Sequence, residues 1–102
     1  MSRPPSTFVG TPAAVDLSDV RLPMWAVFDR PKDFPHAVIA RLFECGRGSD
    51  PLPMNVIVAF ENVEACHAAF AQLVHPGRKV ANAWVWIPRS ECDEPQIIGT
   101  YL

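Results

Sequence analysis

The fold is decided by Met54–Gly77, MNVIVAFENVEACHAAFAQLVHPG, a segment in which a strand passes directly into a helix. Its first part, Met54–Phe60, is rich in β-branched and aromatic residues and predicts a strand. The next part, Glu61–Val74, repeats apolar residues at helical spacing and predicts the main helix, with Asn62 as its N-cap. The proline and glycine that close the segment cannot continue a helix. We therefore expect this helix to cover one face of a sheet.

Two strands are predicted before this segment. Met24–Asp29 is a short run of apolar, aromatic and β-branched residues, which is typical of a strand. The periodicity of His36–Glu44 fits a strand or a helix, and the β-branched residues at its centre favour a strand. Between them, residues 30–35 (RPKDFP) contain two prolines and predict a turn. Cys45–Pro53 is predicted to be a loop because of its glycine and proline content.

Two further strands are predicted after the helix. Lys79–Ile87 alternates along its length and is closed by Pro88, and Gln96–Leu102 predicts a last edge strand. The resulting order is β-β-β-α-β with a possible fifth strand. We therefore predict an α+β fold: a four- to five-stranded mixed, mainly antiparallel sheet with one main helix on one face. The strands on either side of the helix should run parallel to each other.

The predicted strands are apolar on both faces, whereas a sheet with one face in water should alternate apolar and polar residues. The small side chains of Lys79–Ile87 are assigned to the face beneath the helix, which leaves its tryptophans on the uncovered face. Tryptophan and arginine are enriched where proteins bind partners. The residues predicted to bind a partner on this face are Trp25, Arg41, Phe43, Trp84 and Trp86. The alternative is that the chain's own termini cover the face, which would make the tryptophans core residues.

Residues 1–23 form a proline-rich segment that we predict to be an extended arm, followed by a single α+β domain over residues 24–102. The apolar side chains of Val15–Leu22 predict that this part of the arm packs on its own domain or on a second copy. Deleting residues 1–14 should then leave the fold intact. Deletion through Leu22 should lower the stability or change the assembly state.

Composition excludes several classes of protein. Nine Lys and Arg stand against eleven Asp and Glu, a net charge of −2, which argues against a dedicated nucleic-acid binder. Three cysteines without a CxxC spacing point to a reducing compartment, so a cytoplasmic location is predicted. No apolar run is long enough for a membrane span or a signal peptide, so we expect no membrane association.

The sequence predicts no catalytic residue, no metal site and no cofactor. The cysteines and histidines lack the close pairs that usually hold zinc, and no nucleophile, phosphate-loop or paired-carboxylate motif is present. Cys45 lies two residues before Arg47, whose charge would favour a thiolate. A small thiol-dependent enzyme that uses Cys45 therefore remains an alternative.

The segment Trp25–Glu44, WAVFDRPKDFPHAVIARLFE, carries an aromatic–x–Asp–x–Pro–x–Asp–aromatic–Pro turn followed by a run that contains an arginine and a phenylalanine. In these residues, which are about a fifth of the chain, it resembles the strand–turn–strand segment of small uncharacterised bacterial and prophage proteins. The resemblance implies a bacterial or phage origin, and it implies no activity.

These observations predict a non-enzymatic protein-interaction module. It would self-associate as a homodimer or bind another protein through the aromatic sheet face or through an edge strand. The first alternative is a weak binder of single-stranded nucleic acid on the same aromatic platform, with Arg78 and Lys79 near the phosphates. The second is the thiol-dependent enzyme.

Overall fold

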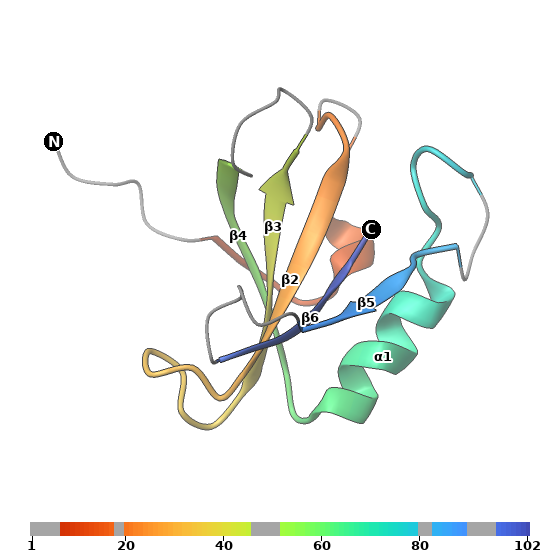
Figure 1. The fold of residues 1–102 in the computed structure, drawn as a ribbon. Coiled ribbons are helices and arrows are strands. Elements are labelled where there is room, and N and C mark those ends of the chain that lie inside the picture. Colours follow the sequence, from red (N-terminus) through yellow and green to blue (C-terminus); the bar gives the residue numbers. More distant parts are fainter. Residues whose placement is uncertain (1–6, 18–19, 46–51, 80–82, 90–95) are drawn as a thin grey trace, which may run out of the picture.

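Six strands and one α-helix are formed by the part of the chain that the computed structural model describes, which is residues 7–17, 20–45, 52–79, 83–89 and 96–102 (Figure 1). The predicted α+β class is confirmed, whereas the predicted number of four to five strands is too low. The elements are β1 (Thr7–Val9), the 3-10 helix η1 (Pro12–Ala14), β2 (Pro23–Asp29), β3 (Val38–Glu44), β4 (Leu52–Phe60), α1 (Val63–Gln72), β5 (Trp86–Pro88) and β6 (Ile97–Tyr101).

The strands form one mixed sheet in the order β1-β4-β3-β2-β6-β5. The antiparallel meander of β2, β3 and β4 is as predicted, and β1 joins it by pairing parallel to β4. The edge position predicted for Gln96–Leu102 is wrong, because β6 lies between β2 and β5. Its side chains are largely covered on both faces, which suits an interior strand. β4 and β5 point the same way, as predicted, but three strands separate them.

Strand lengths differ from the prediction at two places. The strand expected over Lys79–Ile87 is observed only as Trp86–Pro88, and residues 80–82 lie outside the described residues. Lys79 has a φ of 60°, in the left-handed region, and is not part of a strand. Pro88 lies inside β5 because an edge strand tolerates a residue without an N–H. β4 begins at Leu52, inside the predicted loop.

The helix begins where the sequence predicts its cap. Asn62 has an extended backbone, and its side-chain oxygen accepts a hydrogen bond from the Ala65 N–H at 2.8 Å. Glu64 lies in the first turn, where the helix dipole favours a negative charge. Cys66 and Phe70, four residues apart, are the buried residues of α1 and point at the sheet.

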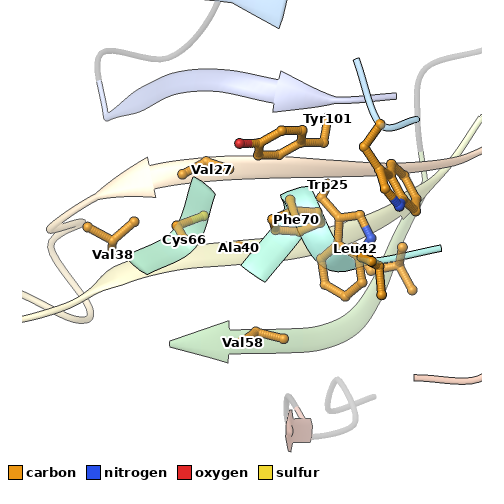
Figure 2. Close-up of a cluster of buried hydrophobic side chains, with 11 residues drawn as sticks. Trp25, Val27, Val38, Ala40, Leu42, Val58, Cys66, Phe70 and Tyr101 are labelled. Atoms are coloured by element: carbon orange, nitrogen blue, oxygen red, sulfur yellow. The ribbon is translucent and has the colours of Figure 1, made fainter. Parts of the chain in front are cut away.

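The core lies between α1 and one face of the sheet (Figure 2). Phe70 is at its centre, with its ring stacked on Tyr101 at 4.3 Å between centroids and edge-on to Trp25 at 5.6 Å and to Trp84 at 6.0 Å. Such aromatic pairs contribute stability beyond the area that they bury. The other buried members of this cluster are Val27, Val38, Ala40, Leu42, Val58, Cys66 and Leu73.

The N-terminal arm is built into the fold on the helix side of the sheet. Thr11 caps η1: its side-chain oxygen accepts a hydrogen bond from the Ala13 N–H, and Pro12, the first residue of η1, is fully buried. Val15, Leu17 and Val20 lie against the core of their own domain, which is one of the two arrangements predicted for this segment; residues 18 and 19 lie outside the described residues. Leu22 is the exception, since 62% of it is exposed.

The structure changes the result expected for deletion of residues 1–14. This deletion removes β1 and η1, together with the contact of Val9 with the core, so it should lower the free energy of unfolding by about 2 kcal/mol. The measurement is the urea midpoint of the shortened chain against that of the full chain. Val9→Ala in the full chain should reproduce part of the loss. An unchanged midpoint would contradict the packing of β1.

Candidate functional site

The five residues predicted to bind a partner divide between the two faces of the sheet. Trp25 and Trp84 are buried in the core beneath α1, and Trp86 lies on the same side with its ring 4.6 Å from that of His67. Arg41 and Phe43 lie on the opposite face. The expected single patch of tryptophans on an uncovered face is therefore not what the structure has.

The position of the helix explains this difference. α1 lies closest to β3 and β4. On the same face of the sheet, the area over β5 and β6 is covered by large aromatic rings and not by the helix. The ring of Trp86 lies directly over Gly99 of β6, and Trp84 contacts Phe70. As a result, Val85 and Ile87, which were expected beneath the helix, face the other way and are 51% and 41% exposed.

One pair of polar side chains on the helix side is hydrogen-bonded within the fold. A hydrogen bond joins Nδ1 of His67 on α1 to the hydroxyl of Tyr101 on β6. Burial, with a smaller contribution from Cys66, raises the pKa of Tyr101 to about 12, so the phenol is neutral at physiological pH. The indole N–H groups of Trp25 and Trp84 are buried and have no hydrogen-bond partner among the described residues. This side of the sheet therefore holds the buried aromatic cluster of the core.

The face opposite α1 carries a row of side chains that crosses the whole sheet. Residues that pair directly across strands project from the same face, and the pairings place one residue of each strand in a line. In the strand order from β1 to β5, this cross-strand row is Phe8, Ile57, Arg41, Ala26, Thr100 and Ile87. Both ends of the row are exposed: Phe8 is 54% exposed and Ile87 is 41% exposed. Arg41 is its charged member.

A pocket of about 310 Å³ lies over Arg41, where residues 30–37 between β2 and β3 fold back over this face. In Figure 1 this connection (gold) and α1 (teal) lie on opposite sides of the sheet. The connection is held by hydrogen bonds from the Phe34 N–H to the Pro31 carbonyl at 2.8 Å and from the Arg30 N–H to the Ala37 carbonyl at 3.0 Å. The lining residues are Phe28, Pro31, Lys32, Asp33, Phe34, Ile39, Arg41, Phe43 and Gln96.

Arg41 is the unusual group in this pocket. Its side chain is half-buried, and its Nε is fully buried without a hydrogen-bond partner among the residues that the structure describes. Leaving a buried polar group unpaired is costly, and more so for a charged one. Lys32 and Asp33 on the rim are exposed to solvent. Arg41 and Phe43 are thus the two predicted residues that the structure brings together.

Sequence reasoning missed the aromatic walls of this pocket, Phe28 and Phe34. The sequence of residues 30–35 predicts a turn, but it gives no sign that Phe34 packs over the sheet. Its ring lies edge-on to Phe8 of β1, 5.3 Å away, on the face opposite the helix. The signal that could have located the site is an arginine between apolar neighbours in β3, preceded by a turn whose phenylalanine is too large and apolar for a solvated loop.

The residues of the two alternative functions have other roles. Arg78, assigned to phosphates in the nucleic-acid interpretation, donates from its Nη1 to the carbonyl oxygens of Ala83 and Leu102. The tryptophans of the stacking platform are core residues or lie against α1. Burial raises the pKa of the Cys45 thiol, which is the opposite of what a reactive thiolate needs. Cys92 and Arg47 lie outside the described residues.

No cluster of three or more metal-ligating side chains occurs within the described ranges. Within the same ranges, α1 is too short to cross a membrane, and no other helix is longer. Comparison with protein-family models, with curated proteins and with solved structures finds no match for this chain.

Proposed function

We propose that this protein is a non-enzymatic interaction module that self-associates through the sheet face opposite α1, around β5. The observation that carries the proposal is the exposure of Val85 and Ile87 on this face. Ile87 lies in the edge strand β5, and Val85 comes directly before that strand. Exposed apolar side chains that lie together mark interaction surfaces more often than isolated ones do. Phe8, at the other end of the cross-strand row, is a further exposed apolar side chain on this face.

A contact between faces fits β5 better than pairing along its edge. Pro88 has no N–H to donate, and β5 spans only three residues, so it offers few main-chain groups to an added strand. If the two-fold axis of the dimer passes near β5, the two copies of Arg41 stay far apart. Arg41 lies in β3, which is three strand spacings of about 4.8 Å from β5. Like charges therefore do not meet in the contact.

The size of the face indicates a weak dimer. Six strands spaced about 4.8 Å apart span about 24 Å, and a five-residue strand is about 17 Å long, so the whole face measures about 400 Å² in projection. Residues 30–37 fold over part of this face, so a contact around β5 buries less than that on each copy. Stable interfaces bury about 1,200–2,000 Å² in total. We therefore expect association in the micromolar range or weaker, which is visible only at high protein concentration.

Sedimentation velocity across a range of concentrations tests this proposal. The full chain should shift from monomer to dimer as its concentration rises toward the millimolar range. The double variant Val85→Ser with Ile87→Ser should raise the dissociation constant at least tenfold, because it removes the apolar contact. Val74→Ser is the matched control, since Val74 is 55% exposed but follows α1 on the other side of the sheet.

Two results would contradict self-association. If the chain remains monomeric at every concentration, self-association is wrong, and only the binding of a different protein is left of the interaction hypothesis. Equal weakening by Val74→Ser and by the β5 double variant would show that association does not use this face.

We also propose a cytoplasmic location and a bacterial or phage origin. The odd number of cysteines supports the first, and the resemblance of Trp25–Glu44 to bacterial and prophage proteins supports the second.

A further inference from the structure

We propose that the pocket over Arg41 binds a small organic carboxylate with an aromatic or aliphatic body. This inference goes beyond self-association, because it requires only the pocket between the β2–β3 connection and the sheet. Three observations support it: the size and walls of the pocket, the buried Nε of Arg41 without a partner among the described residues, and the charges of the lining residues.

The pocket has the size and the lining of a small-molecule site. Its volume of about 310 Å³ is at the lower end of the range for such sites, which are mostly apolar with a few polar groups that fix the ligand. Three of its walls are the rings of Phe28, Phe34 and Phe43, and Ile39 is buried beneath it. A flat or branched apolar group therefore fits between the connection and the sheet.

Arg41 defines the charge of the ligand. Its Nε is buried and without a partner, and a guanidinium presents its donors in a planar fork that matches a carboxylate. Its row neighbours Ala26 and Ile57 are buried and offer no side-chain acceptor. A ligand carboxylate would supply the missing acceptor, in a setting where aromatic walls limit competition from water.

The other charges favour a carboxylate over a phosphate. Lys32 and Asp33 on the rim carry opposite charges, so the residues that line the pocket have a net charge of +1, and Arg41 is the half-buried cation among them. A group with a single negative charge balances it. A phosphate dianion would bring a second negative charge toward Asp33, without a buried cation to receive it.

Phenylacetate and phenylacetamide are the matched probes, since they share a ring and differ in charge. Each is titrated into the ¹⁵N-labelled full chain and followed by the amide signals of β2, β3 and their connection. Phenylacetate should give saturable shifts there, and phenylacetamide should bind at least tenfold more weakly, because it lacks the charge-assisted hydrogen bond. Arg41→Gln should abolish the preference for the acid, while Arg41→Lys should keep part of it.

Control variants separate this site from its surroundings. Lys32→Gln should weaken phenylacetate binding no more than about threefold, since Lys32 is exposed and solvent screens its charge. The β5 double variant should bind phenylacetate as the unaltered chain does. If dimerisation fails while phenylacetate binding persists, the proposed function is wrong and the carboxylate site stands.

Three results would overturn the carboxylate site. They are equal affinities for the acid and the amide, an unchanged preference in Arg41→Lys and Arg41→Gln, or shifts centred away from the pocket. Inorganic phosphate that binds more tightly than phenylacetate would overturn the assignment to carboxylates. If Arg41→Gln fails to fold, the probe pair on the unaltered chain and Arg41→Lys still decide the outcome.

Discussion

Phe70→Ala is expected to lower the free energy of unfolding by about 3–5 kcal/mol, the cost of removing a buried phenylalanine ring. The ring is 1% exposed and contacts Trp25, Trp84 and Tyr101, which come from three separate segments of the chain. These neighbours are large and rigid, so they cannot collapse into the cavity. Since domains of this size are stable by about 5–15 kcal/mol, the loss is a large part of the total.

Urea denaturation followed by tryptophan fluorescence measures this loss. Phe70→Leu is the matched control, because leucine keeps most of the apolar volume and should cost less than half as much. Phe60→Ala is a second control, since Phe60 is only half-buried and its ring lies 6.5 Å from that of Phe70. A Phe70→Ala midpoint close to that of Phe60→Ala would contradict the central position of Phe70.

Gly99→Ala is expected to have the second-largest effect, a loss of about 3 kcal/mol from overpacking. A methyl group at this position would overlap the indole of Trp86 and approach the carbonyl oxygen of Ile87 to 2.8 Å. The backbone oxygen belongs to the pairing of β5 with β6, so it cannot move without disturbing that pairing. The indole is held by contacts with His67 and Tyr101.

Gly10→Ala is the matched control for this substitution, because nothing lies within 4 Å of the position of its added carbon. Thermal unfolding should show a large drop for Gly99→Ala and almost none for Gly10→Ala. Near-UV circular dichroism of Gly99→Ala should also change, since Trp86 must leave its position over β6. Equal melting temperatures for the two variants would show that β5 shifts at little cost.

Much of the fold could be predicted from local sequence. The β-branched run of β4 predicts that strand, and the Asn62 cap with the closing proline and glycine predicts α1. β1 could not be predicted in this way, because three residues in a proline-rich arm carry no periodic signal. Its parallel pairing with β4 joins residues about fifty positions apart.

The candidate site could be predicted only in part, because both faces of the sheet are apolar. Alternation shows which residues share a face: Ile39, Arg41 and Phe43 were correctly placed together. When both faces are apolar, alternation does not show which face the helix covers. The assignment of small residues to the helix side therefore reversed the faces of Trp84 and Val85.

The position of β6 has a consequence for how the chain folds as it is synthesised. β2 is made early, yet the strand that pairs with its second side begins at Ile97, about seventy residues later. Until then the nascent meander has one unpaired strand edge, and Phe70 lacks the Tyr101 ring that stacks on it. Such long-range pairing slows folding and exposes open strands to other chains. The growing polypeptide is therefore most prone to aggregate during translation of the stretch between α1 and β6.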